Sequence, residues 1–240
     1  MSNTLNTAGL RASLQAVSSQ VDTVKVRQEE DGWHLYGGSN YSVANVHITR
    51  DAFTEYHQED DFVADVKDLM EPLAKMGDTV TVDTSSGKLV VSGGRFRYTR
   101  KLVADIDVFP RMPKAELSTE AVLPVDLLAE IFSAVPPKQA ASMTLRLTAS
   151  ADGLTVQVYE RGSEYGRVDM SIPAADCTLL SGEAKSVFSF IMLSDIVKAV
   201  PKGTDVDLLF DTGYPLMVRY TVGCADIVLA LAPQLEDEDL

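Results

Sequence analysis

The stretch DVDLLFDTGYPLMVRYTVGCADIVLALAPQLEDEDL, residues 205–240, decides how the rest of the chain is interpreted. It contains three apolar runs, at Asp205–Phe210, Leu216–Val222 and Asp226–Leu231. Asp, Gly and Pro separate the first two runs, so we expect a β-hairpin followed by a third strand. Pro233 has no backbone N–H, so sheet pairing should stop there and leave Leu235 just beyond the sheet.

An internal repeat divides the chain into two halves. The triplets Val24–Val26, Asp31–Trp33 and Val46–Ile48 match Leu145–Leu147, Asp152–Leu154 and Val168–Met170, and Lys75–Thr84 matches Pro201–Thr212. Apolar residues at helical spacing predict helices at Asn6–Val21, Val66–Met76, Val125–Val135 and Phe190–Val200. Each half therefore reads as helices followed by strands, and stacking on a neighbour is how a repeat buries its apolar faces.

The segment 105–124 breaks this pattern. It contains Pro110, Pro113 and Pro124 with mixed charge and no sustained periodicity, which is typical of a linker. We therefore expect an N-terminal domain at residues 1–104, a connecting linker at 105–124, and a C-terminal domain at 125–240 that ends in an acidic tail.

Composition excludes several classes of protein. The chain has 240 residues and a formal net charge of −14, so the basic footprint of most DNA-binding proteins is missing. No apolar run approaches the roughly 20 residues that span a bilayer, and no signal peptide is visible, so we expect a cytoplasmic protein without membrane contact. Cys177 and Cys224 offer no basis for a disulfide framework or a zinc site.

The polar residues form no recognisable catalytic motif. The histidines at 34, 47 and 57 lack metal-ligand spacing with the two cysteines, and the loop 57–61 reads as a solvated charged loop. Gly93-Gly94 lacks the Lys-Ser/Thr of a phosphate loop, and no Gly-x-Ser-x-Gly elbow is present. We expect no catalytic residues, no metal and no cofactor, hence no enzyme.

The motifs Tyr-Pro-Leu-Met-Val-Arg-Tyr at 214–220 and Leu-Ala-Pro-Gln-Leu-Glu-Asp-Glu at 231–238 resemble the C-terminus of DNA sliding clamps of the proliferating-cell-nuclear-antigen type. The order of helix, sheet, helix, sheet and linker, then the same again, extends the resemblance over nearly the whole chain. It implies an α+β DNA-clamp fold: two similar domains, each with two helices on antiparallel sheets, closing into a homotrimeric ring. It also implies that Arg95–Val103 and Arg167–Ile172 are edge strands that pair between neighbouring chains.

The resemblance implies a DNA polymerase sliding clamp, a processivity factor that encircles double-stranded DNA without sequence preference. Such a clamp tethers DNA polymerase, ligase and flap nuclease, and an ATP-driven clamp loader opens it. The implied DNA-facing residues are Arg11, Lys75, Lys198 and Lys202. Other basic positions of the family are replaced by Ala12, Ser18, Glu130 and Ser133. With a net charge of −14 we expect weak, strongly salt-dependent DNA contact and a salt-rich cytoplasm.

A pocket for partner peptides is also implied by the resemblance. Its residues match Val43, Met112, Pro113, Leu117, Pro215, Ala232, Pro233 and Leu235, which are apolar, as an anchor cavity requires. Asn45 and Ala230 depart from the family pattern, in which an apolar and an aromatic residue are common, so the preferred anchor differs.

Three alternatives remain. The chain could be a subunit of a heteromeric or checkpoint-type clamp, which light scattering on the lone chain would distinguish from a homotrimer. It could be a two-domain β-rich binding module with a coincidental repeat. It could also be an enzyme whose residues follow no known motif.

Overall fold

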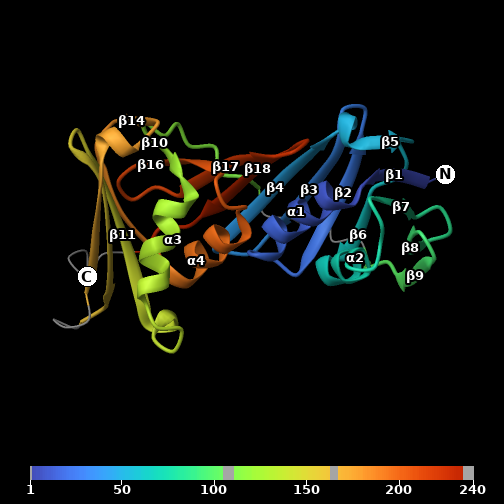
Figure 1. The fold of residues 1–240 in the computed structure, drawn as a ribbon, viewed down its shortest axis with the longest axis horizontal. Helices are drawn as coiled ribbons and strands as arrows, with labels where there is room; N and C mark the ends of the chain where they lie inside the picture. Colours follow the sequence, from blue (N-terminus) through green and yellow to red (C-terminus); the bar gives the residue numbers. More distant parts are fainter. Residues whose placement is uncertain (1, 105–110, 163–166, 235–240) are drawn as a thin grey trace. The chain divides into compact units, whose positions relative to one another are not determined.

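The computed structural model describes residues 2–104, 111–162 and 167–234. The chain forms two compact units, each described here by itself (Figure 1). The first comprises Met1–Met112 with Thr221–Val228, and the second comprises Pro113–Tyr220 with Leu229–Leu240. Within the described residues each unit has two α-helices and antiparallel strands, which confirms the predicted α+β class.

The first unit packs helices α1 and α2 on antiparallel sheets. Its elements are β1 (Ser2–Asn6), α1 (Thr7–Ser18), β2 (Thr23–Glu29), β3 (Gly32–Gly38), β4 (Ser42–Thr49), the 3-10 turn η1 (Arg50–Ala52), β5 (Phe53–Glu55), β6 (Phe62–Asp65), α2 (Val66–Leu73), β7 (Thr79–Asp83), β8 (Lys88–Gly93) and β9 (Phe96–Lys101). One sheet has the order β5-β1-β7-β8-β9, and β4-β3-β2-β6 are neighbours in another. Residues Thr221–Val228 border β4, where Thr49 N donates to Cys224 O at 2.9 Å.

The second unit repeats this arrangement. Its elements are β10 (Thr119–Pro124), α3 (Val125–Ala134), η2 (Ala140–Ser142), β11 (Met143–Ser150), β12 (Gly153–Glu160), β13 (Val168–Pro173), η3 (Ala174–Asp176), β14 (Leu179–Ser181), β15 (Ala184–Ser189), α4 (Phe190–Ala199), β16 (Asp205–Phe210), β17 (Leu216–Val222) and β18 (Ala225–Leu231). The strands β13-β12-β11-β15 form one antiparallel sheet, and β14-β10-β16-β17 are neighbours in another.

The predicted repeat is visible in the backbone hydrogen bonds. Where a strand passes into a helix, Thr7 N donates to Asp78 O and Val125 N donates to Thr204 O, both at 2.9 Å. These bonds place β1 and α1 in the first unit where β10 and α3 stand in the second. The repeated unit is therefore a strand, a helix and a sheet, taken twice in each half of the chain.

A tight Asp-Gly turn is repeated as well. Arg50 N donates to Asp31 O at 2.7 Å, and Ala174 N donates to Asp152 O at 3.0 Å. When the strand pairing is counted from each turn, Val46–Ile48 in the first unit is equivalent to Met170–Ile172 in the second. The equivalence with Val168–Met170 that was predicted from sequence is therefore wrong by two residues. A shift of two keeps the same side chains on the same sheet face, so the apolar pattern alone does not distinguish the two alignments.

The four predicted helices are present and all are shorter than predicted, α3 and α4 by one residue and α1 and α2 by more. Helix α1 ends at Ser18 instead of Val21, where the hydroxyls of Ser18 and Ser19 donate to carbonyls of the last turn at 2.9 and 2.6 Å. Helix α2 contains Pro72 and ends at Leu73, before the predicted Met76. A proline inside a helix removes one backbone donor, which favours an early end.

Two strands that begin the repeats were missed by the sequence analysis. Strand β1 is mostly polar, and it is held by tertiary contacts: Asn3 is buried and its Nδ2 donates to Gln28 Oε1 at 2.7 Å. Strand β10 lies inside the predicted linker, so the part of that segment without helix or strand is 111–118; residues 105–110 lie outside the described part. Sequence periodicity cannot reveal a polar strand whose partners are distant in sequence.

Gly32 and Gly87 provide a matched test of the tight turn. Both have a positive φ, but a Cβ on Gly32 would lie 2.1 Å from Ile48 O, whereas one on Gly87 would meet nothing within 4 Å. We expect Gly87→Ala to cost about 1 kcal/mol of unfolding free energy from backbone strain, and Gly32→Ala to cost at least about 3 kcal/mol. Urea denaturation measures both, and equal losses would contradict the steric argument.

Candidate functional site

The outer face of α1 is small, polar and weakly basic. Its exposed residues recur every three to four positions, at Ala8, Arg11, Gln15 and Ser18. The inner face buries Leu10, Leu14 and Val17. Arg11 is therefore held in solvent by a helix whose opposite side is anchored in the core, as the prediction of a DNA-facing residue requires.

Lys75 lies one residue beyond the C-cap of α2, and it is exposed. Its Nζ lies 5.9 Å from the centre of the Tyr98 ring, within the range of a cation–π contact. Lys67, near the start of α2, is also exposed, and the sequence analysis did not select it. Its position between the buried Val66 and Leu69 is the signal that could have identified it.

In the second unit the two predicted basic residues lie at the end of α4. Lys198 is exposed, and its Nζ is 3.3 Å from Asp195 Oδ1, one helical turn earlier. Lys202 is exposed in the turn that follows the helix. The other helix of this unit, α3, has Asp126 and Glu130 and no basic residue.

The helices as a set are not basic. Together α1, α2, α3 and α4 carry three basic residues, Arg11, Lys67 and Lys198, and five acidic ones, Asp68, Glu71, Asp126, Glu130 and Asp195. One acid of each unit is paired, since Asp68 also accepts from Arg100 Nε at 3.0 Å. These faces can give weak contact with a phosphate backbone and no sequence readout.

The predicted pocket residues fall on four segments of the chain. Val43 is buried in β4, whereas the others that the structure describes are half-buried: Met112, Pro113, Leu117, Pro215, Ala232 and Pro233. Val43 and Met112 belong to the first unit and the remainder to the second, so the joint pocket stays a prediction. Leu235 lies outside the described residues.

Two exposed tyrosines stand beside this set. Tyr41 is 68% exposed two residues before Val43, and Tyr214 is 54% exposed next to Pro215. Large aromatic side chains are rarely left in solvent without a partner surface, and they are enriched at protein interfaces. The sequence analysis missed both, although an aromatic residue inside a polar turn was the available signal.

Asp211 fixes the end of segment 111–118. Its carboxylate accepts from Ser118 N and Ser118 Oγ, both at 2.9 Å, and from Thr119 Oγ1 at 3.2 Å. Burial raises the pKa of Asp211, but these hydrogen bonds outweigh it and the net effect is a lowered pKa. The chain that follows β18 is also held in place. Gln234 N donates to Val187 O at 2.7 Å, which fixes the backbone just after Pro233.

The predicted edge strands are confirmed as edges of their own sheets. Strand β9 pairs with β8, and β13 pairs with β12, and each lies at the end of its sheet's strand order. Nearly all residues of β9 are exposed, including Phe96 at 47%. Strand β9 carries three basic residues and no acid, whereas β13 carries Asp169, which accepts from Arg167 at 2.7 Å.

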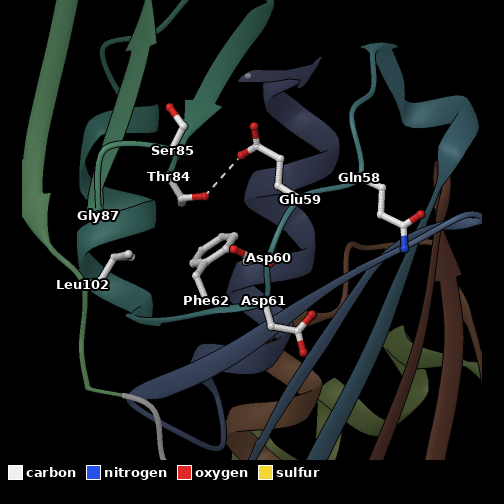
Figure 2. A pocket seen from close by; sticks show the side chains of 9 residues that line it. All are labelled: Gln58, Glu59, Asp60, Asp61, Phe62, Thr84, Ser85, Gly87 and Leu102. Carbon is white, nitrogen blue, oxygen red and sulfur yellow. Dashed lines mark hydrogen bonds between the residues drawn. The ribbon is translucent and has the colours of Figure 1, made fainter.

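An acid-lined cavity of about 780 Å³ lies beside the loop 57–61 (Figure 2). Glu59, Asp60 and Asp61 line one side, and Thr84 Oγ1 lies 3.5 Å from Glu59 Oε2. Four of the five residues of the loop are exposed, as the prediction of a solvated loop requires, and Asn3 also holds it through His57 N at 2.6 Å and His57 O at 3.0 Å. The cavity favours cations, and nothing in it resembles catalytic machinery.

A second polar cluster contains two of the three histidines. Asp31, His34 and His47 bring three potential metal-ligand atoms within 4.8 Å of one another. The sequence analysis compared the histidines only with the cysteines and did not consider strand register. Cys177 and Cys224 are free thiols. Among the described residues no helix is long and apolar enough to cross a membrane.

Comparison with known proteins gives one consistent family. No family model matches the chain. It is 27% identical over 241 residues to the DNA polymerase sliding clamp of Natronomonas pharaonis, covering 95% of this chain and 96% of that protein. It is 28% identical over 242 residues to the sliding clamp of Methanothrix thermoacetophila, with the same coverage of 95% and 96%. In fold it matches A. fulgidus PCNA bound to the C-terminal region of FEN-1, with a TM-score of 0.86, 18% identity and coverage of 98% and 99%.

Asp211→Asn tests the attachment of segment 111–118. Replacing the charged acceptor should lower the free energy of unfolding by about 1 kcal/mol and speed amide exchange at Ser118. Because the pKa of Asp211 is lowered in the fold, this contribution is fully present above the ordinary aspartate pKa of 3.8 and is lost as pH falls through the lowered pKa of the folded state. Asp226→Asn, which affects a carboxylate bonded to Thr221, is the control; unchanged exchange at Ser118 in Asp211→Asn would contradict the prediction.

Proposed function

We propose, from the premise that this chain is a DNA sliding clamp of the proliferating-cell-nuclear-antigen type, that it acts as a homotrimeric processivity factor. The ring encircles double-stranded DNA without sequence preference and tethers DNA polymerase, ligase and flap nuclease at the replication fork. An ATP-driven loader opens it. The clamp itself performs no catalytic step, and its domains are joined by a linker that ends before β10 at Thr119.

The open edges of β9 and β13 carry this proposal. Within the first unit, β4 is bordered by residues 221–228 of the C-terminal hairpin. In the repeat, β4 corresponds to β13, and β18 corresponds to β9. Within one chain, β18 lies beside β4. Their equivalents, β9 and β13, each lie at an open sheet edge, so β9 of one copy can lie beside β13 of another copy in the same way. Pairing β9 of one copy with β13 of the next satisfies both edges.

Charge supports the same pairing. Strand β9 carries Arg97, Arg100 and Lys101 and the facing strand carries Asp169, although Arg100 and Asp169 also pair within the chain, with Asp68 and Arg167. A contact between two different surfaces is heterologous, and it closes into a ring when the rotation between copies closes. Three copies give the ring that the resemblance predicted.

DNA contact in this ring is weak. The four predicted DNA-facing residues, Arg11, Lys75, Lys198 and Lys202, stand among helices that carry more acidic than basic residues. Three chains triple the net charge of −14, which repels a duplex in dilute buffer. At molar salt the screening length is only about 3 Å, so the repulsion largely disappears. Topology then retains the DNA without strong phosphate binding.

Partner peptides dock on the apolar set that flanks segment 111–118. In this proposal the apolar walls are supplied by Val43, Met112, Pro113, Leu117, Pro215, Ala232, Pro233 and Leu235. Tyr41 and Tyr214 are exposed beside them and supply aromatic contacts. The relative whose structure is known with the C-terminal region of FEN-1 supports a flap nuclease as one such partner.

Ring closure is tested by reversing charge on the open edge. We expect the wild-type chain to have three times the chain mass by light scattering, both at about 0.2 M salt and at molar salt, where the screening length is roughly two-fold shorter. Arg97→Glu with Lys101→Glu should lower the mass to that of one chain, because like charges then face each other across the new pairing. Lys88→Glu, a single charge reversal on the inner strand β8, should leave the trimer intact.

The same proteins test DNA retention. Loaded by an archaeal clamp loader with ATP, the wild type and Lys88→Glu should stay on nicked circular DNA and be released when the circle is cut, whereas the edge variant should not be retained. Equal retention on linear DNA would contradict a topological clamp. A lone chain that stays monomeric at every salt concentration would instead identify a subunit of a heteromeric clamp.

A further inference from the structure

Three side chains from the β2–β3 turn and the neighbouring strands converge at the surface of the first unit. His34 Nε2 lies 3.0 Å from Asp31 Oδ1, and His47 Nε2 lies 3.4 Å from Asp31 Oδ2. The side chains of His34 and His47 are 16% and 25% exposed, whereas that of Asp31 is 57% exposed. The two imidazoles thus form the floor of a small site, and the carboxylate forms its open rim.

The backbone holds these groups in place. His34 of β3 and His47 of β4 are directly opposite each other in the antiparallel register. Gly32 lets the turn approach β4 so closely that Arg50 N donates to Asp31 O at 2.7 Å. Asp31 is therefore fixed over the two imidazoles by the same tight turn that the fold repeats in its second unit.

The donor set matches a particular class of ion. Two imidazole nitrogens and one carboxylate are ligands of Zn²⁺ and related divalent transition metals, and three protein ligands leave a position for water. Ligands about 2.0–2.1 Å from a tetrahedral Zn²⁺ lie about 3.3 Å from one another. His34 Nε2 and His47 Nε2 lie 3.0 and 3.4 Å from different oxygens of Asp31, and all three ligand atoms lie within 4.8 Å of one another, so a small rearrangement brings them to this spacing. We propose that Asp31, His34 and His47 form a binding site for a divalent transition-metal ion such as Zn²⁺.

Metal binding changes the arrangement of the two rings. His34 and His47 are stacked with centroids 4.2 Å apart and planes only 6° from parallel, and Tyr36 extends the stack on the far side of His34. A metal lies in the plane of each imidazole that it binds, and parallel planes share no such point. At least one histidine must therefore turn about its Cβ–Cγ bond when the ion binds, and the His34–His47 stack is lost.

The second unit provides an internal comparison. The equivalent turn has Asp152 and Gly153, and the positions of His34 and His47 are occupied by Thr155 and Ser171, which are opposite each other in the same way. The hairpin therefore folds without histidines at these positions. Two imidazoles aimed at one carboxylate are not a requirement of the repeat, so the pair in the first unit needs another reason.

Local charge favours a cation. Glu29 and Glu30 precede Asp31 and are exposed in the same turn, and the chain as a whole carries a net charge of −14. An acidic surface also attracts Mg²⁺ and Ca²⁺, which prefer oxygen ligands and bind imidazole poorly. Selectivity for Zn²⁺ over Mg²⁺ is therefore the property that separates this site from the general acidic surface.

The test is titration of the full chain with Zn²⁺ by calorimetry in excess Mg²⁺, and with Co²⁺ by visible absorption. We expect one Zn²⁺ per chain and the strong d–d bands of a tetrahedral or five-coordinate Co²⁺ site. The double variant His34→Thr with His47→Ser copies the second unit and should therefore fold. It should bind Zn²⁺ at least about 100-fold more weakly, since even loss of an outer partner of a metal ligand costs up to about that factor.

His57→Ser, which removes the remaining histidine, is the matched control and should bind Zn²⁺ as the wild type does. Circular dichroism and mass establish that each variant is folded and assembled, so the outcome does not depend on clamp function. In NMR spectra of the wild type, Zn²⁺ should shift the His34 and His47 ring signals as stacking is lost. Equal Zn²⁺ affinity in the double variant, or displacement of Zn²⁺ by Mg²⁺, would overturn the proposal.

Discussion

Backbone N–H and C=O groups at the edge of a β-sheet need partners, and the arrangement of this protein depends on how that need is met. In the first unit, β4 is covered by residues 221–228 of the C-terminal hairpin, with Thr49 N bonded to Cys224 O. Strands β9 and β13, their counterparts in the repeat, end their sheets with exposed edges. Duplication of one unit thus produces both a covered edge and an open one, and the open edges define where another copy can add.

The charge of the helices is the second determinant of function. Arg11 stands on a face of α1 that is otherwise small and polar. Lys198 is already paired with Asp195, and the charged residues of α3 are all acidic. Helices with this balance cannot hold DNA through phosphate contacts alone. A protein of this charge is suited to retain DNA by enclosing it, because enclosure is independent of the sign of the surface and leaves the duplex free to slide.

The repeated Asp-Gly turns show which residues the fold requires and which it leaves free. Gly32 and Gly153 are both needed, because a Cβ at either would collide with a carbonyl of the adjacent strand, at 2.1 and 2.2 Å. The outward positions beside them are not constrained in this way. One copy has His34 and His47 and the other has Thr155 and Ser171, in the same register. At such positions the backbone does not depend on a particular side chain, so one copy of the repeat can carry functional side chains that the other copy lacks.

The sequence by itself determined the fold class, the helices, the repeat and the family resemblance. Apolar periodicity and turn residues are local signals, so they can be recognised without knowing which residues meet in the folded protein. It did not reveal the polar strand β1, whose buried Asn3 bonds to Gln28 and to the backbone of His57, nor β10 within the predicted linker. It also placed β4 and β13 two residues out of register, since a shift of two preserves the alternation. Only the tertiary structure brought Asp31, His34 and His47 together, because cross-strand neighbours are set by register, and register depends on how closely the Gly32 turn approaches β4.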